Sequence, residues 1–417
     1  MRIFFRGFLV VLLVSLLAGP VFADPSVQEM QKQLQKLMQQ VDAQKQQIEA
    51  LQGKIKEMQP KMAEQAAAAP AAAPTVTSKY KLNIYGKVKF DAIYDTIDMG
   101  TDEYIKFIPK AAKTEDKTTF NIRETRLGLA IEGPAYNGWT PRARFETDFY
   151  GSDANSRNGA LRARLAYVNF SKGDTSITVG QDWNKIASLN PTVLDFAIMG
   201  YNGNLWERMP QITVQQKFQG GLEGLVTVYR GRWGDDDDVA NATINMPWVG
   251  ARVGYTGKLI DQEKDAWLAL GGAFRTGRAN DNDVTPYVAA LEVQIPYSYV
   301  EFRGEAYMGQ GLGFESFHKG GAFNAAGHAI LTKGGFAQLG VRPMKDILCT
   351  VGYGIDDPKN IDVGDAFYQK SQYSFGNVIY TLMKDINAGI GATYLDTKWE
   401  TKDEHGWRYQ ATLTYDF

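Results

Sequence analysis

The stretch HGWRYQATLTYDF, residues 405–417, ends the chain and decides its fold. Apolar or aromatic residues occupy every second position, at Trp407, Tyr409, Ala411, Leu413, Tyr415 and Phe417, and polar residues lie between them, at Arg408, Gln410, Thr412, Thr414 and Asp416. Successive side chains of a β-strand point to opposite faces, so this strand has one apolar and one hydrophilic face. The apolar face has aromatic residues at both ends, as the two interfaces of a membrane favour, so the pattern predicts a strand that faces lipid on one side.

The same alternation recurs from residue 80 to the C-terminus. In KLNIYGKVKFDAIYD, residues 81–95, one face carries Leu82, Ile84, Val88, Phe90 and Ala92, and the other carries Asn83, Tyr85, Lys87, Lys89 and Asp91. In residues 161–170, Leu161, Ala163 and Leu165 are expected to point outward. About 16 such segments can be placed, an even number within the range of water-filled membrane barrels. We therefore predict an all-β transmembrane barrel of about 16 antiparallel strands over residues 80–417.

A soluble β-sandwich is the alternative fold. Its sheets share a packed core, whereas here the second face is charged on strand after strand, as a water-filled lumen allows. The formal net charge is −2 and there is no long basic run, so the composition gives no support for nucleic-acid binding. The single cysteine, Cys349, excludes an intramolecular disulfide.

The connections between the predicted strands differ in length. Residues 133–138 and 171–174 read as tight turns, whereas 96–119, 151–159 and 183–205 are longer. In outer-membrane barrels the short turns face the periplasm and the long loops face outward. The first strand is therefore expected to run outward from the periplasm.

Three segments precede the barrel. Residues 1–23 combine Arg2 and Arg6 with an apolar core and small residues before a cleavage site, which predicts a signal peptide. In residues 24–62 the apolar positions step by three and four, which predicts an α-helical coiled coil in the periplasm. Residues 63–79 are Ala- and Pro-rich and read as a linker. A coiled coil needs partners, so we expect an oligomer; a lone amphipathic helix on another surface is the alternative.

Seven cationic side chains are predicted to line one wall of the lumen: Lys87, Lys89, Arg126, Arg142, Arg144, Arg162 and Arg164. Strands adjacent in sequence are adjacent in an up-and-down barrel, so these side chains form one surface, which attracts anions. Arginine presents a planar fork suited to carboxylate or phosphate. The alternative is that Glu124, Glu146 and Asp148 hold these cations in ion pairs that only stiffen the wall.

The stretch WNKIASLNPTVLDFAIMGYNGNLWERMPQ, residues 183–211, contains too many apolar residues for a fully solvated loop. It must pack against the barrel interior or against a neighbouring subunit. It occupies the place of the third outer loop, which in ordinary 16-strand barrels of this kind folds into the lumen and narrows it. The candidate constriction residues are Asp182, Lys185, Asp195 and Arg208.

Nothing in the sequence indicates catalysis. The histidines His318, His328 and His405 have no metal-ligand spacing, and no nucleophile–base arrangement can be argued. The run Asp235–Asp238 is expected to be a solvated loop tip rather than a cation site. We therefore expect neither an enzyme, nor a metal site, nor a cofactor.

The layout as a whole resembles the DcaP-like porins of Gram-negative bacteria. The resemblance rests on the signal peptide, the coiled coil, the linker, the motifs IYGKVKFDAIYD (84–95), TRLGLAIEGP (125–134), LRARLAYVNF (161–170), VGQDWN (179–184) and ERMPQI (207–212), and the terminal Phe417. It is strongest over residues 80–215. It implies a homotrimer of 16-stranded barrels whose arginine-lined pores favour dicarboxylates. The last strand also resembles those of other outer-membrane barrels, in which the barrel-assembly machinery reads the terminal aromatic residue, so Phe417 is the implied assembly signal.

These observations together predict a protein of the outer membrane of a Gram-negative bacterium. We expect it to act as a porin for passive diffusion of small hydrophilic solutes, with a preference for anions such as dicarboxylates. Its expected partners are outer-membrane lipid and lipopolysaccharide, the barrel-assembly machinery, small anionic solutes and two further copies of the chain. The alternative is a structural envelope protein whose coiled coil tethers the outer membrane to peptidoglycan.

Overall fold

The computed structural model describes residues 79–113, 115–151, 159–230, 246–313, 317, 321–363 and 367–417, together with Gln46, Glu49, Ala50 and Gly53, which are helical. The predicted signal peptide (1–23), the rest of the predicted coiled coil (24–62), the linker up to residue 78 and the Asp235–Asp238 run lie outside the described residues. Contacts divide the chain into units of residues 1–77 and 78–417, and the second unit is the one described below.

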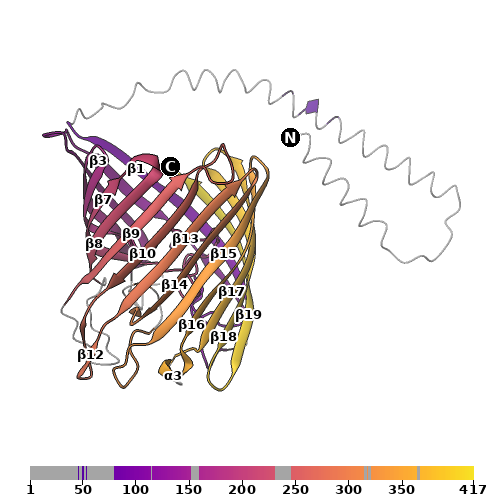
Figure 1. Cartoon of the computed structure of the whole chain (residues 1–417). Helices are drawn as coiled ribbons and strands as arrows, with labels where there is room; N and C mark the ends of the chain where they lie inside the picture. Colours follow the sequence, from indigo (N-terminus) through magenta and orange to yellow (C-terminus); the bar gives the residue numbers. More distant parts are fainter. Residues whose placement is uncertain are drawn as a thin grey trace, which may run out of the picture. The chain divides into compact units, whose positions relative to one another are not determined.

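The second unit is a closed antiparallel β-barrel (Figure 1). Over its described residues the sheet has 17 strands in 16 positions, which confirms the predicted count of about 16. The strands are β1 (Lys81–Asp95), β2 (Lys117–Asn121), β3 (Arg126–Glu132), β4 (Thr140–Gly151), β5 (Ala160–Lys172), β6 (Thr175–Trp183), β7 (Arg208–Lys217), β8 (Leu222–Tyr229), β9 (Trp248–Gly257), β10 (Ala266–Phe274), β13 (Tyr287–Tyr297), β14 (Val300–Gln310), β15 (Leu331–Met344), β16 (Ile347–Pro358), β17 (Lys370–Met383), β18 (Ile386–Lys398) and β19 (Asp403–Asp416). The connections contain a separate hairpin, β11 (Gly277–Ala279) with β12 (Asn282–Val284), and two short helices, η1 (Gln219–Gly221) and α3 (Asn360–Val363).

The strand β1 closes the barrel. On one edge it pairs with β19 in antiparallel register, with Ala92 opposite Ala411. The backbones of Gly86 and Phe417 exchange hydrogen bonds of 2.9 and 3.1 Å at the end of this pairing. On its other edge β1 pairs first with β3 and then with β2, so β2 and β3 share one position as an interrupted strand.

The alternation in the last strand has the predicted consequence. In β19 the side chains of Trp407, Tyr409 and Leu413 are exposed on the outside of the barrel, whereas Arg408 is only 1% exposed on the inside. A lipid bilayer solvates the apolar face, and the lumen accepts the polar face. Among the residues that the structure describes, no helix is both long and apolar enough to cross a membrane.

The strand β5 departs from the predicted alternation at one point. Glu146 of β4 lies opposite Leu165, whereas the next residue, Thr147, lies opposite Ala163, so Arg164 is an extra residue in β5. Such a β-bulge shifts the side-chain alternation by one position. Leu161 and Ala163 are exposed as predicted, but Leu165 is buried beside Arg164, so its predicted outward position is wrong.

The two ends of the barrel have different connections. One end has turns such as 173–174, 298–299, 345–346 and 384–385, and it also holds the start of β1 and the C-terminus. The other end has connections such as 184–207 and 311–330, and in Figure 1 the labels β12 and α3 lie there. We call these the short-turn end and the long-loop end.

Candidate functional site in the lumen

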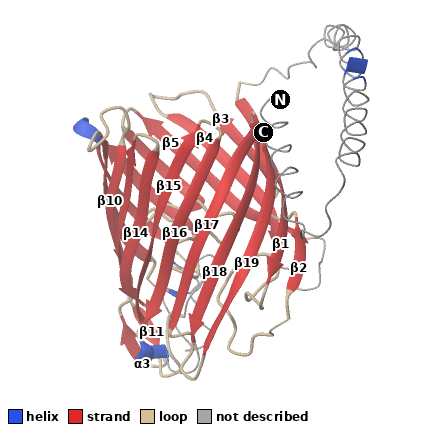
Figure 2. Ribbon diagram, turned by 90° about the vertical axis from the view of Figure 1, so that its right-hand side faces the viewer, coloured by secondary structure: helices blue, strands red, loops and turns tan. Residues whose placement is uncertain are grey.

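The segment 184–207, between β6 and β7, crosses the lumen, and we call it the inner loop. The inner loop begins at Asn184, and the side-chain oxygen of Asn184 accepts hydrogen bonds from the backbone N–H groups of Ile186 and Ala187 at 2.8 and 3.1 Å. On the far wall Glu292 accepts the N–H groups of Ser188 and Leu189. Loops can be seen inside the barrel in Figure 2.

Further contacts attach the inner loop to other strands. Glu305 of β14 accepts the N–H group of Leu205 at 2.8 Å, and Gln338 of β15 accepts that of Thr192 at 2.7 Å. On the near side Lys89 of β1 donates to the carbonyl oxygen of Leu194 at 2.8 Å. The inner loop is therefore anchored on both sides of the lumen.

The apolar side chains of the inner loop pack inside the barrel, which is one of the two places that the sequence left open. Ile186 and Leu205 belong to a buried cluster with Trp248 and Phe317. Phe196 stacks on Tyr150 of β4, with ring centroids 3.8 Å apart. These contacts give the apolar residues of residues 183–211 the partners that a solvated loop would lack.

A second segment also lies inside, and it was missed at the sequence level. Residues 96–119 were expected to form an outer loop, but Ile97, Met99, Ile105 and Ile108 of this segment are buried. The Ile105 N–H group donates to Asp195 of the inner loop at 3.0 Å. The signal was weak, because apolar residues gather in YIKFI (104–108) but the segment around them is rich in charged residues.

The first three cations of the predicted wall meet at one carboxylate. Lys87, Lys89 and Arg126 all form ion pairs with Glu124, which lies between β2 and β3. Lys89 also lies 3.4 Å from Asp91. Two carboxylates therefore partly neutralise these three cations.

Two further arginines, both on β5, bind the carboxylates of β4. Arg164 is fully buried and donates to Glu146 at 2.7 Å and to Asp148 at 2.8 Å. Arg162 contacts the same Asp148 at 2.6 Å. The structure thus contains the ion pairs that the alternative interpretation of the wall expected, with the three carboxylates it named.

The remaining two arginines lie near the short-turn end of β4. Arg142 is half exposed and pairs with Glu132 at 2.9 Å. Arg144 lies over the ring of Tyr85, with its guanidinium carbon 4.5 Å from the centroid, and its Nε donates to the Tyr85 hydroxyl. Within the described part of the chain, Arg144 is the member of the wall that forms no ion pair with a carboxylate.

The four candidate constriction residues lie at the two ends and in the middle of the inner loop. Asp182 and Lys185 pair with each other at 2.6 Å at its start. Arg208 follows its end, is 2% exposed, and lies over the rings of Trp183 and Trp206. The structure does not bring these four side chains together into one ring.

Asp195 lies in the middle of the inner loop and is 4% exposed. It pairs with Arg408 of β19 at 3.1 Å, and Arg408 also holds Asp95 of β1 at 2.6 Å. Burial raises the pKa of Asp195 to about 6, although Arg408 and the backbone N–H groups of Ile105 and Ala197 oppose that shift. This carboxylate therefore titrates near neutral pH.

Two cavities open inside the barrel around these residues. One of about 560 Å³ lies toward the short-turn end, and its polar lining includes Arg142, Arg144, Tyr167, Asn169, Thr178, Asp182, Lys185, Thr213 and Gln215. A smaller one of about 260 Å³ is lined by Lys87, Lys89, Glu124 and Asp195, among others. No group of three or more His, Cys, Asp or Glu side chains that could hold a metal ion is found among the described residues.

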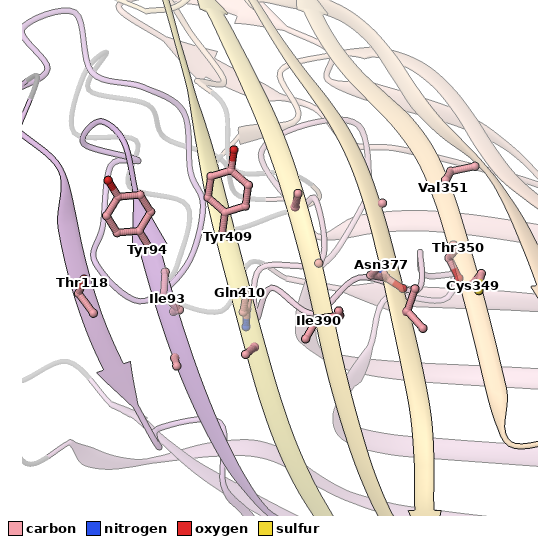
Figure 3. A pocket seen from close by; sticks show the side chains of 16 residues that line it. Ile93, Tyr94, Thr118, Cys349, Thr350, Val351, Asn377, Ile390, Tyr409 and Gln410 are labelled. Atoms are coloured by element: carbon pink, nitrogen blue, oxygen red, sulfur yellow. The ribbon is translucent and has the colours of Figure 1, made fainter. Parts of the chain in front are cut away.

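A third hollow, of about 750 Å³, lies on the outside of the wall (Figure 3). Its lining comes from β1, β2, β16, β17, β18 and β19, and it includes the outward-facing Tyr94, Cys349, Val351 and Tyr409. Apolar and small side chains dominate its lining, as is expected of a surface covered by lipid or protein. It contributes nothing to the lumen.

The fold and the lumen define a barrel of the outer-membrane class, and comparison with known proteins agrees. Residues 23–242 match the family model of the DcaP outer membrane protein, and the chain belongs to that family. Comparison with curated proteins finds no match.

Solved structures share the fold. The outer membrane channel DcaP of Acinetobacter baumannii is similar, with 21% identity, coverage of 81% of this chain and 97% of that one, and a TM-score of 0.72. An anion-selective porin from Comamonas acidovorans is similar at 13% identity, with coverage of 81% and 100% and a TM-score of 0.59. The trimer form of OmpT from Vibrio cholerae is similar at 10% identity, with coverage of 81% and 99% and a TM-score of 0.52.

Proposed function

We propose that this protein is an outer-membrane porin that lets small hydrophilic solutes diffuse passively and favours anions, dicarboxylates among them. The observation that carries the proposal is the charge of the lumen wall. Seven cations on β1 and β3–β5 face five carboxylates, namely Asp91, Glu124, Glu132, Glu146 and Asp148, so cations are in excess. A confined wall with that excess concentrates anions and repels cations.

The shape of the barrel supports passive passage rather than catalysis. The polar faces of the strands line an interior that the inner loop partly fills, and cavities of about 560 and 260 Å³ lie beside that loop. Families with this fold include proteins described as an outer membrane channel and as an anion-selective porin. In an outer-membrane barrel the short turns face the periplasm, so the short-turn end is periplasmic and the long-loop end is external.

The proposal includes a homotrimer with its coiled coil in the periplasm. Residues 24–62 carry heptads that need partner helices, and they join the barrel at the start of β1, at the short-turn end. A similar barrel, OmpT of Vibrio cholerae, is described in a trimer form. Outer-membrane lipid and lipopolysaccharide would surround the trimer, and the barrel-assembly machinery would insert it.

The test is the zero-current potential of the purified protein in a planar bilayer under a salt gradient. We expect a potential of the sign set by anions. The double variant Arg142→Ala with Arg144→Ala should reduce it, because both side chains lie on the short-turn side of the lumen. A cation-selective sign would mean that the carboxylates of the wall dominate. Absence of conductance would favour the alternative of a structural protein that tethers the outer membrane to peptidoglycan.

A further inference from the structure

We propose that the cavity of about 560 Å³ at the short-turn end is a solute-binding site for a hydroxylated carboxylate, in which Arg144 binds the carboxylate group. The inference rests on the proposed porin function and deepens it by naming a site, a side of the inner loop and a class of ligand.

The charge of Arg144 is the first argument. Six of the seven wall cations have a carboxylate partner, so a solute must compete with a fixed ion pair to bind them. Arg144 donates instead to the hydroxyl of Tyr85 on β1, and Tyr167 on β5 lines the same cavity. Tyrosine is uncharged at neutral pH, so the hydrogen bond to Tyr85 orients the guanidinium without neutralising it.

The rest of the lining decides what else the solute must carry. On the neighbouring strands β5–β7 the lining presents amide and hydroxyl groups: Asn169, Ser176, Thr178, Thr213 and Gln215. Both ammonium groups of the lining are already paired, that of Lys185 with Asp182 at 2.6 Å and that of Lys81 with Glu132 at 2.8 Å. A solute with a carboxylate at one end and hydroxyl groups at the other therefore matches this cavity, and its volume lies in the range of small-molecule sites.

The position of the cavity predicts the end of the barrel from which a solute reaches the site more easily. Its lining extends from Lys185, in the inner loop, to Glu132 and Arg142, near the short-turn end. A solute from the short-turn end reaches Arg144 without passing the inner loop, whereas a solute from the long-loop end must first cross it. Block by such a solute should therefore depend on the side of addition.

The experiment measures block of the chloride current through single channels of the full-length protein by gluconate, which has one carboxylate and several hydroxyl groups. An antibody against an N-terminal tag assigns the orientation of each channel, because the chain enters the barrel at the short-turn end. We expect saturable block with a faster association rate from the short-turn side. Glucose, which lacks the carboxylate, should block much less, and succinate should block no better than gluconate.

The variants separate the site from general charge. Arg144→Ala should weaken gluconate block by roughly tenfold or more, as for loss of a charge-assisted hydrogen bond. Arg144→Lys should restore part of it. Lys384→Ala is the matched control, because Lys384 lies in a turn at the same short-turn end, is 92% exposed and does not line the cavity; gluconate block of this variant should stay within about twofold of the wild type.

Two failures can be told apart on the same bilayers. If the wild-type channel is anion-selective but gluconate blocks the Arg144→Ala channel as strongly as the wild type, the proposed binding site is wrong and the porin proposal stands. The same holds if glucose blocks the wild-type channel as strongly as gluconate. Stronger block by succinate would also overturn the ligand class. If the wild-type channel is cation-selective, the proposed function itself is wrong.

Discussion

At the scale of single residues, the lumen wall is stabilised by arginines that share carboxylates. Arg164 is the clearest case, because it is fully buried and contacts both Glu146 and Asp148. Removal of one partner from a buried ion pair leaves the other charges without compensation, which costs far more than the pair itself contributes. Arg142, by contrast, pairs with Glu132 near solvent, where an ion pair contributes little.

Arg164→Ala should therefore lower the free energy of unfolding by about 3–5 kcal/mol, measured by urea titration of the barrel refolded in lipid vesicles. Arg142→Ala is the control and should change it by less than about 1 kcal/mol. Equal effects of the two substitutions would contradict the role assigned to burial.

Asp195 should make ion selectivity depend on pH. Its raised pKa of about 6 means that it loses its negative charge as the pH falls through that value. The ratio of anion to cation permeability should then rise as the pH falls from 7 to 5, measured from zero-current potentials. Asp195→Asn should remove this step, and a step that survives in that variant would assign it to another group.

Protonation of Asp195 should also change the free energy of unfolding of the barrel. The folded pKa of Asp195 lies above its ordinary value of 3.8, so the folded protein binds more protons than the unfolded chain between these values. The contribution of Asp195 to the free energy of unfolding therefore falls as the pH rises from about 4 to about 6. Asp195→Asn should flatten that part of the stability profile.

At the scale of elements, the inner loop depends on carboxylates of the far wall. Glu292 accepts the N–H groups of Ser188 and Leu189, and Glu305 accepts that of Leu205. The double variant Glu292→Ala with Glu305→Ala should detach the loop from β13 and β14 and raise both single-channel conductance and current noise. Glu132→Ala is the control, because Glu132 lies near the short-turn end and contacts Lys81 and Arg142; it should leave the noise unchanged.

The last strand offers a test of the proposed assembly signal. The backbone of Phe417 exchanges hydrogen bonds with Gly86, and its side chain is half exposed on the outside. Phe417→Ala keeps these backbone bonds, so the folded barrel should remain stable once formed, but the amount that reaches the outer membrane should fall several-fold. Phe417→Tyr keeps the aromatic ring and should assemble normally. Normal assembly of Phe417→Ala, measured by the folded band on a semi-native gel, would remove the role proposed for this residue.

At the scale of the whole molecule, the N-terminal heptads and the barrel are proposed to act together in a trimer. Deletion of residues 24–62 should lower the fraction of trimer, measured by native mass spectrometry in detergent, and leave the conductance per barrel unchanged. A deletion of similar length cannot be made inside the barrel without removing strands, so the control is a scrambled helix of the same composition without heptads. If neither the deletion nor the scrambled helix changed the trimer fraction, contacts between the barrels alone would stabilise the trimer.

The sequence by itself determined the barrel, because its period-two alternation is a local property of each strand. Alternation predicted the outward face of β19 and the inward face of Lys87 and Lys89, and the apolar excess in residues 183–211 predicted a packed loop. These inferences required knowledge of the direction of side chains along a strand, and no knowledge of contacts between distant residues.

Only the tertiary structure decided which charges in the lumen are compensated. Leu165 turns inward because of a bulge at Arg164, and residues 97–108 fold inside because they pack against the inner loop. Arg144 and Arg164 look alike in sequence, yet one donates to a tyrosine and the other lies between carboxylates. The reason is physical: an ion pair depends on distances of a few ångströms between strands, and these distances are set by register and by loops that come from far along the chain.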